Sequence, residues 1–501
     1  MSTPVPTLPT TLPDVDVPAR ARAGAASIVL TRTSDGAGPA LIGPGGDDLT
    51  PDWVDAVGLT GKAGEVLPGP LGSATAWVVG IGAGKPEHWR TAGAALARAI
   101  DAGLAADPEA SATAAVHLPD DTTADEAALL ARGLRLGGYR YRVTEEEPEP
   151  RLRSAALVVS DKDRRDRIAA AVRRSSTLDL ATAFARDLAN TPSNVKDPAW
   201  LARTAAKAAG RIAGLDTHVR DERWLADHGF GGLLAVGGGS SRPPRLLHLS
   251  WSPPDAEGPH IALVGKGITF DTGGISIKPN EGMHLMRTDM AGGAAVIAAT
   301  LAIARLALPV RVTALVPCAE NHVSGSAYRP GDIVRHYGGR TTEVLNTDAE
   351  GRMVLADGLV YARDLGADIL VDAATLTGAM KVSLGVRIGG LFANDDEVAS
   401  RLADAGASVG ESWWRMPLLD QYAAEVASDI ADVRQCPPGP GAITAALFLR
   451  EFVGDLPWAH LDIAGPARAD RTYDDVVPGA SGFAARTLVE YVASYVAGPR
   501  S

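Results

Sequence analysis

The chain has 501 residues and a formal net charge of −12, with 46% hydrophobic and 22% charged residues. This length exceeds one ordinary hydrophobic core, so we expect two globular domains. The acidic balance argues against general nucleic-acid binding, which needs concentrated Lys and Arg, and the presence of only two cysteines excludes a disulfide scaffold.

The first 20 residues are rich in Pro and Thr and contain no apolar segment. We therefore expect a flexible N-terminal tail at 1–20 and no signal peptide. The sequence contains no run of about eighteen apolar residues, the length that predicts a membrane span. A membrane is therefore not an expected partner. With so few cysteines, the simplest location is the reducing cytoplasm.

Residues 21–162 alternate short apolar runs with amphipathic helical patterns. Such alternation predicts a small N-terminal α/β domain with a mostly parallel or mixed sheet flanked by helices. We expect its strands at 26–30, 74–79, 113–118 and 155–160, and its helices at 89–104 and 124–136.

The segment 80–85 (Gly-Ile-Gly-Ala-Gly-Lys) superficially suggests a phosphate-binding loop. Its spacing does not fit, because Val79 stands where the first glycine should be and Pro86 follows the lysine. A tight turn between a strand and a helix is the better interpretation. The acidic, proline-containing segment 145–150 predicts a solvated connection.

A helical pattern with many arginines covers 163–189, and we expect this helix to connect the two domains. Residues 190–501 again alternate strands and helices, which predicts a larger C-terminal α/β domain with a mostly parallel sheet. In such sheets a site lies at the carboxyl ends of the strands. We expect strands at 261–264, 311–316, 369–372, 388–392 and 459–463, and helices at 290–306, 350–364 and 443–453.

Acidic residues gather at the expected carboxyl ends of these strands. A glycine-rich stretch at 265–279 follows the 261–264 strand and contains Lys266 and Asp271. Glycine lets the backbone approach a ligand closely. Asp289 follows at the start of the next expected helix. We therefore expect both carboxylates to face one crevice.

Two further carboxylates, Asp348 and Glu350, lie in 346–352 (Asn-Thr-Asp-Ala-Glu-Gly-Arg), where a strand gives way to a helix. Acidic groups favour helix N-termini, so a helix cap with a salt bridge to Arg352 is the structural alternative. A dry cluster of four carboxylates must either protonate or bind cations. Four carboxylates suit two divalent metal ions about 3.5–4 Å apart, which share carboxylates and deprotonate a water.

Three cations near these carboxylates suggest separate roles. Lys266, beside Asp271, could bind metal as a neutral amine or could lie on the surface. Lys278 lies further out and could donate to a developing oxyanion. Arg352 stays charged and could hold a small planar anion on its planar fork. The histidines share no metal-ligand spacing, which predicts structural roles for them.

The stretches 265–279 and 346–352 resemble the two signatures of the leucyl aminopeptidase, or cytosol aminopeptidase, family of dinuclear metallopeptidases. Supporting similarity spans about 190 to 490, and the first domain resembles the family more loosely. The resemblance implies that 190–501 is the metallopeptidase catalytic domain. Thr272 stands where many relatives have Ser, a mild departure that touches no expected ligand.

The resemblance also implies a metal-binding role for each acidic residue. Asp271 and Glu350 would bridge two divalent ions, either Mn²⁺ or Zn²⁺. Lys266 and Asp289 would complete the tighter of the two metal sites, and Asp348 would complete the more exchangeable one.

The catalytic and substrate-binding positions follow from the same resemblance. Lys278 and Arg352 match the family's two catalytic positions, and Arg352 would hold a bicarbonate that acts as general base. The pocket for the first side chain would be formed by Met286, Asn346, Thr375, Leu376, Gly378, Ala464 and Ala467.

The implied activity is release of N-terminal amino acids from peptides, with a broad preference for Leu- or Met-like first residues. The family's catalytic domains assemble as a homohexamer, a dimer of trimers. A Cys-Gly or other dipeptidase in glutathione turnover is an alternative that uses the same site residues. A secondary DNA-binding role is another, but the acidic net charge counts against nucleic acid as a partner.

Overall fold

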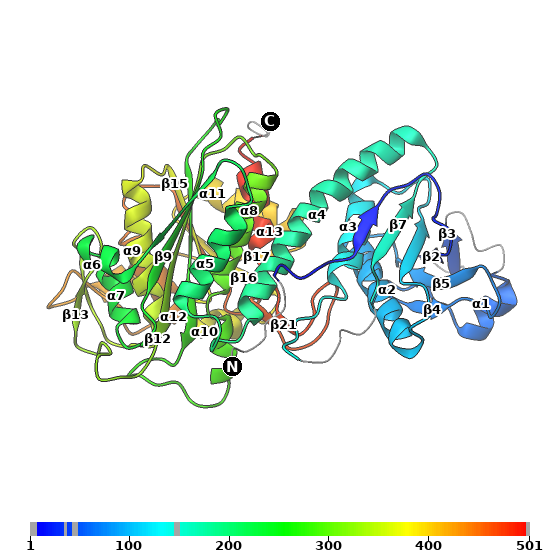
Figure 1. The fold of residues 1–501 in the computed structure, drawn as a ribbon. Helices are drawn as coiled ribbons and strands as arrows, with labels where there is room; N and C mark the ends of the chain where they lie inside the picture. Colours follow the sequence, from blue (N-terminus) through cyan, green and yellow to red (C-terminus); the bar gives the residue numbers. More distant parts are fainter. Residues whose placement is uncertain (1–7, 35–37, 43–48, 145–150, 497–501) are drawn as a thin grey trace. The chain divides into compact units, whose positions relative to one another are not determined.

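The structure of the protein is a computed structural model that describes residues 8–34, 38–42, 49–144 and 151–496 (Figure 1). The expected acidic connection at 145–150 and the first part of the expected tail lie outside this description. The chain forms two compact units, one of residues 1–183 with 470–478 and one of 184–469 with 479–501. No helix in the described ranges is long and apolar enough to cross a membrane.

The first unit is built on one sheet with the strand order β1-β7-β6-β2-β5-β4, and β3 also pairs with β2. β3 and β4 run antiparallel to their neighbours, whereas the other pairings are parallel. The strands are β1 (Asp14–Asp16), β2 (Ala26–Ser34), β3 (Gly38–Ile42), β4 (Val66–Pro68), β5 (Thr75–Gly80), β6 (Thr113–His117) and β7 (Ser154–Val158).

Part of the expected tail is ordered, because β1 pairs with β7 and buries Val15. The helices of this unit are α1 (Pro51–Val57), α2 (Pro86–Ala106) and α3 (Ala124–Leu136). The segment 80–85 is the turn from β5 into α2, and Pro86 suits the first position of that helix. A capping box formed by Thr123 and Glu126 begins α3.

Residues 470–478 return from the C-terminal part of the chain to the first unit. Arg90 of α2 ion-pairs there with Asp474 at 3.4 Å and with Asp475 at 3.2 Å. The side chains of Arg90 and Asp475 are both buried, so this pairing is screened little by solvent. The domains predicted in chain order did not include this return.

The second unit contains a larger sheet with the order β17-β16-β19-β15-β10-β12-β9-β8, and β11 pairs with β12. Its centre is parallel, whereas β8, β9 and the β16–β19 pairing are antiparallel. The strands are β8 (Leu215–Arg220), β9 (Arg245–Trp251), β10 (Ile261–Gly265), β11 (Gly267–Asp271), β12 (Val312–Asn321), β15 (Ile369–Ala374), β16 (Ile388–Ala393), β17 (Ser412–Arg415) and β19 (Trp458–Asp462).

Helices cover the sheet of the second unit. α8 and α9 both pack against β10, β12 and β15, and Figure 1 shows them on either side of these strands. The helices are α5 (Pro198–Ala209), α6 (Glu222–Asp227), α7 (Gly231–Gly237), α8 (Ala291–Arg305), α9 (Glu350–Asp364), α10 (Gly378–Leu384), α11 (Asp396–Ser408), α12 (Gly441–Arg450) and α13 (Ala485–Ala493), and α4 (Lys162–Asn190) leads in from the first unit.

Short elements complete this unit. Two 3₁₀ helices are η1 (Met283–Thr288) and η2 (Asp420–Val426). One small sheet joins β13 (Ile333–Arg335), β14 (Thr341–Glu343) and β18 (Val433–Arg434), and another joins β20 (Arg468–Ala469) and β21 (Gly479–Ala480). The predicted α/β fold class, with helix-flanked sheets and a larger C-terminal domain, is confirmed.

Candidate metal centre

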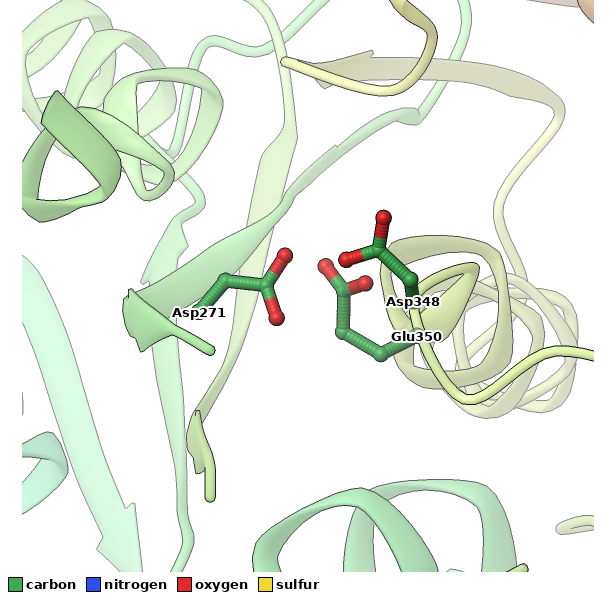
Figure 2. A group of neighbouring side chains, drawn as sticks. All are labelled: Asp271, Asp348 and Glu350. Atoms are coloured by element: carbon green, nitrogen blue, oxygen red, sulfur yellow. The ribbon is translucent and has the colours of Figure 1, made fainter. Parts of the chain in front are cut away.

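The acidic site lies where several elements of the second unit begin or end. Asp271 is the last residue of β11, Glu350 is the first residue of α9, and Asp348 precedes that helix. Figure 2 shows the Asp271 carboxylate facing those of Asp348 and Glu350. One oxygen from each of the three carboxylates lies within 4.8 Å of the other two. Such a convergence of oxygen donors suits a divalent cation.

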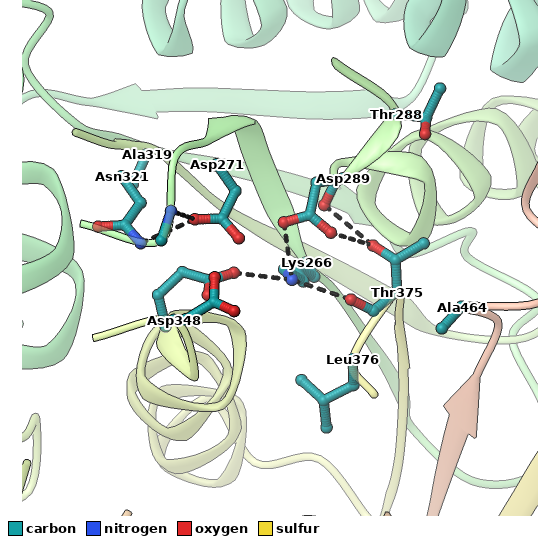
Figure 3. Close-up of polar contacts among 12 residues, drawn as sticks. Lys266, Asp271, Thr288, Asp289, Ala319, Asn321, Asp348, Thr375, Leu376 and Ala464 are labelled. Carbon is teal, nitrogen blue, oxygen red and sulfur yellow. Dashed lines mark hydrogen bonds and ion pairs between the residues drawn. The ribbon is translucent and has the colours of Figure 1, made fainter. Parts of the chain in front are cut away.

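Lys266 lies between β10 and β11, and its ammonium group lies among the acidic side chains (Figure 3). Its Nζ is 2.9 Å from Asp289 Oδ2 and 2.8 Å from Glu350 Oε1. It also donates a hydrogen bond of 2.9 Å to the carbonyl of Thr375. Because the side chain is only 4% exposed, the alternative of a surface lysine is wrong.

Lys278 approaches the same cluster from a more open side. Its Nζ is 2.8 Å from Asp271 Oδ2 and also ion-pairs with Asp348 Oδ1. The side chain is 20% exposed, so it has access to solvent that Lys266 lacks. Lys278 is therefore the more exposed of the two lysines in the cluster.

Arg352 is buried beside the cluster without pairing to it. Its Nη1 donates a hydrogen bond of 2.7 Å to the carbonyl of Gln435. Among the residues that the structure describes, Arg352 forms no ion pair with Asp348 or Glu350. The alternative of a plain salt bridge within 346–352 is therefore not what the structure shows.

Asp289, Asp348 and Glu350 hold protons more strongly than free carboxylates do. Burial raises the pKa of Glu350 to about 8, and the charge of Asp271 adds to this effect. The same two causes raise the pKa of Asp348 to about 6. Burial also raises the pKa of Asp289. For Lys266, burial lowers the pKa, but the neighbouring carboxylates outweigh it and the pKa is raised.

These residues fit bound divalent metal ions. Asp289 Oδ2, Asp348 Oδ1 and Glu350 Oε1 are buried and have no hydrogen-bond donor of good geometry among the described residues. Each of them meets a lysine ammonium as an ion pair instead. Buried carboxylate oxygens without hydrogen bonds are costly, and ions such as Mn²⁺ favour carboxylate ligands.

Hydrogen bonds from outside the two signatures hold the acidic side chains in place. Asn321, at the end of β12, donates to Asp271 Oδ1 at 2.8 Å and to the carbonyl of Thr347 at 3.0 Å. The buried hydroxyl of Tyr328 donates to the same carbonyl at 2.9 Å. Asn321 thus joins the two acidic segments directly, a role that the sequence did not predict.

Thr347 connects the two signature stretches through its side chain. Its hydroxyl donates to the carbonyl of Gly273 at 2.7 Å and accepts from the amide of Ser276 at 2.8 Å. The Ser276 hydroxyl in turn accepts from the Thr347 amide at 3.2 Å. These bonds fix the distance between Asp271 and Asp348, which lie on the two connected stretches.

Gln435 supports the segment 346–352 from the other side and is fully buried. Its side-chain oxygen accepts from the amides of Leu345 at 3.2 Å and Asn346 at 3.1 Å. Its side-chain nitrogen donates to the carbonyl of Ala349 at 2.9 Å. The side-chain amide of Gln435 therefore forms hydrogen bonds with backbone groups on both sides of Asp348.

The expected pocket residues lie on four segments around the cluster. Thr375 contacts it directly, because its hydroxyl donates to Asp289 Oδ1 at 2.8 Å. Figure 3 shows Leu376 and Ala464 near Thr375. The other positions are Met286 in η1, Asn346 before Asp348, Gly378 at the start of α10 and Ala467 before β20. Their contact with a substrate stays a prediction.

One signal in the sequence could have identified Asn321. The expected strand at 311–316 is too short, because β12 continues to Asn321. The residues after Val316 are still mostly apolar, so a longer strand would have placed Asn321 at a carboxyl end beside the site. Tyr328 and Gln435 lie in irregular stretches and give no comparable signal.

Comparison with known proteins agrees with this geometry. Residues 183–489 match the family model described as "Cytosol aminopeptidase family, catalytic domain", and residues 52–148 match that of its N-terminal domain. The chain belongs to the cytosol aminopeptidase family. It is therefore a metal-dependent aminopeptidase, a hydrolase that acts on peptides.

Relatives within the family are similar along nearly the whole chain. A probable cytosol aminopeptidase of Leifsonia xyli is 42% identical, over 96% of this chain and 98% of that protein. One from Nocardia farcinica is also 42% identical, over 95% of this chain and 94% of its own. A solved structure, the bottromycin maturation enzyme BotP in complex with Mn, is 38% identical with a TM-score of 0.82, covering 94% of this chain and 99% of that one.

The family and enzyme class predicted from 265–279 and 346–352 are confirmed by this membership. The roles predicted for individual residues stay predictions.

Proposed function

We propose that the protein releases N-terminal amino acids, preferably Leu- or Met-like ones, from peptides by means of two divalent metal ions and bicarbonate. The main support is the single buried cluster in which Asp271, Asp289, Asp348 and Glu350 meet two lysine ammonium groups. Such an excess of buried negative charge calls for further cations.

The proposed metal ligands are those that the family resemblance implies, and their side chains lie together in the cluster. Asp271 and Glu350 would hold both ions, and in support of this their carboxylates face each other within the cluster of three. Lys266, as a neutral amine once bound cations displace its proton, and Asp289 would complete one site, and Asp348 would complete the other. When bound, two such ions polarise the scissile carbonyl and lower the pKa of a shared water. The ions would be Mn²⁺ or Zn²⁺.

Lys278 would stabilise the negative charge that develops on the scissile carbonyl oxygen. Its ammonium lies within ion-pair distance of Asp271 and Asp348 and is partly exposed. The nearby carboxylates outweigh the effect of burial and raise its pKa, so it stays charged at neutral pH. A charged donor held at this place needs little reorganisation when the oxyanion forms.

Arg352 would hold the bicarbonate. Among the described residues, its guanidinium donates one hydrogen bond, to the carbonyl of Gln435, and its Nε is buried without a hydrogen-bond partner. A planar guanidinium with free donors recognises a planar anion through two parallel hydrogen bonds. A bicarbonate bound there would supply a general base.

Metal removal tests the proposal. The chelated protein should lose hydrolysis of Leu-p-nitroanilide and recover it with Mn²⁺ or Zn²⁺, with two ions bound per subunit by elemental analysis. Asp271→Asn should bind fewer ions and should not recover, because it removes a carboxylate charge from the shared position. Undiminished hydrolysis by the chelated protein would refute the metal-dependent mechanism. Cys-Gly added as a competing substrate tests for dipeptidase activity through its inhibition of Leu-p-nitroanilide hydrolysis.

A further inference from the structure

A short loop connects the acidic cluster with a buried aspartate that belongs to no signature. The loop is 375–377, between β15 and α10. On one side, the hydroxyl of Thr375 donates to Asp289 Oδ1 at 2.8 Å and its carbonyl accepts from Lys266 at 2.9 Å. On the other side, the loop is held by Asp462, the last residue of β19.

Asp462 uses both carboxylate oxygens for this purpose. Its Oδ2 accepts from the hydroxyl of Thr377 at 2.6 Å and from the amide of that residue at 3.1 Å. Its Oδ1 accepts from the amides of Leu376 at 3.3 Å and Ala464 at 3.1 Å. One side chain therefore binds the backbone of two segments that are far apart in the sequence.

The place of Asp462 in the sheet explains why it can reach both segments. β15 and β19 are adjacent and parallel, and Asp462 is the register partner of Ala374. Both strands end near this level, so the amides of Leu376, Thr377 and Ala464 lie beyond the sheet and need another acceptor. Asp462 provides it and is fully buried, which makes its hydrogen bonds stronger than those of an exposed aspartate.

We propose that Asp462 is a positioning residue that fixes Leu376 and Ala464 beside the acidic cluster and thereby sets the preference for large apolar first residues. This inference rests on the proposed function and on the pocket that the family resemblance implies for the first side chain, to which Leu376 and Ala464 belong. A pocket wall that is held in place before the substrate binds favours a Leu side chain, which packs against the wall. An Ala side chain is too short to make the same contacts, so it gains less.

The test compares the kcat/KM values for Leu- and Ala-p-nitroanilide in the metal-loaded enzyme. Thr377→Val keeps the shape of the residue but removes its hydroxyl bond to Asp462, and Asp462→Asn replaces an acceptor oxygen with a donor. Both should reduce the Leu-to-Ala ratio, by about tenfold in Asp462→Asn. The bound metal per subunit should not change, because Asp462 is not among the proposed ligands.

Two controls isolate the effect. Thr377→Ser keeps the hydroxyl and should keep the wild-type ratio. Thr300→Val removes another buried hydroxyl, which bonds the carbonyl of Val296 within α8, and should also keep the ratio even if it lowers stability.

An unchanged ratio in Thr377→Val and Asp462→Asn, with both substrates slowed equally, would refute the positioning role. If Asp462→Asn does not fold, the comparison of Thr377→Val with Thr377→Ser decides alone. Failure of the proposed function is recognised separately, because the wild-type enzyme would then hydrolyse neither substrate.

Discussion

Lys266, Lys278 and Arg352 all belong to the region of the acidic cluster, yet their surroundings differ. Lys266 is buried between Asp289 and Glu350, whereas Lys278 is partly exposed. Arg352 donates a hydrogen bond to the backbone carbonyl of Gln435 instead of to a carboxylate. These differences support separate roles for the three cations, with Lys266 inside the metal site and Lys278 facing the substrate.

The raised pKa of Glu350 predicts how stability depends on pH in the chelated protein. The pKa is about 8 in the folded chain, against about 4.3 for an unfolded glutamate. Between these values the folded state holds more protons, so this group makes the free energy of unfolding fall as pH rises. Glu350→Gln cannot ionise and should therefore gain stability relative to wild type from about pH 5 to about pH 8.

Urea unfolding in the presence of chelator, at several pH values, measures this difference. Glu350→Gln and wild type should be closest at pH 5. Added Mn²⁺ should stabilise wild type more than the variant, since the ion favours the ionised carboxylate. A difference that does not grow with pH would contradict the assignment of the raised pKa to Glu350.

At the scale of elements, the start of α8 determines how closely Asp289 approaches the ends of β10 and β15. Gly292 and Gly293 stand there, and the amide of Gly293 donates to the carbonyl of Lys266 at 2.8 Å. A Cβ atom on Gly292 would lie 2.0 Å from the carbonyl oxygen of Ala373. The helix can therefore lie against the strands only with glycine at this position.

Gly292→Ala should destabilise the protein by about 3 kcal/mol, because the new methyl group overlaps backbone. The higher helix propensity of alanine favours the variant by at most about 1 kcal/mol, so the overlap prevails. Gly325→Ala is the matched control, since a Cβ atom there meets nothing within 4 Å. Urea unfolding should show a change within about 0.5 kcal/mol for this control. Equal stability of the two variants would contradict the close approach.

At the scale of the whole molecule, the second unit exposes large apolar side chains. Ile277 is 64% exposed, Trp414 is 61% exposed and Val382 is 89% exposed. Exposed apolar groups of this size favour contacts between subunits, although single ones are common on monomers. They agree with our proposal, first made from the family resemblance, of a homohexamer arranged as a dimer of trimers.

Light scattering after size-exclusion chromatography should give the mass of six chains at micromolar concentration. Trimers are expected as the intermediate on dilution if the hexamer is a dimer of trimers. A mass of one chain over the whole concentration range would refute the proposed assembly.

Local patterns in the sequence were sufficient to predict the α/β fold, the helices α8 and α9, and the residues of the acidic cluster. The helix expected at 350–364 is α9 with the same bounds, because its apolar period is regular and its start is marked by acidic residues. The edge strands β8 and β17 were not predicted, and neither was β9, which lies between β8 and β12. Edge strands are partly exposed and lack the continuous apolar runs of the central strands.

The sequence by itself identified the groups that we propose to supply the chemistry, since Lys266, Asp271, Asp348 and Glu350 lie in two compact stretches with recognisable spacing. Only the tertiary structure showed what holds those groups in place. Asn321, Gln435 and Asp462 act through hydrogen bonds to residues 26 to 90 positions away in the chain. Such contacts depend on strand order and on where each strand ends, and no local pattern of residues records either of them.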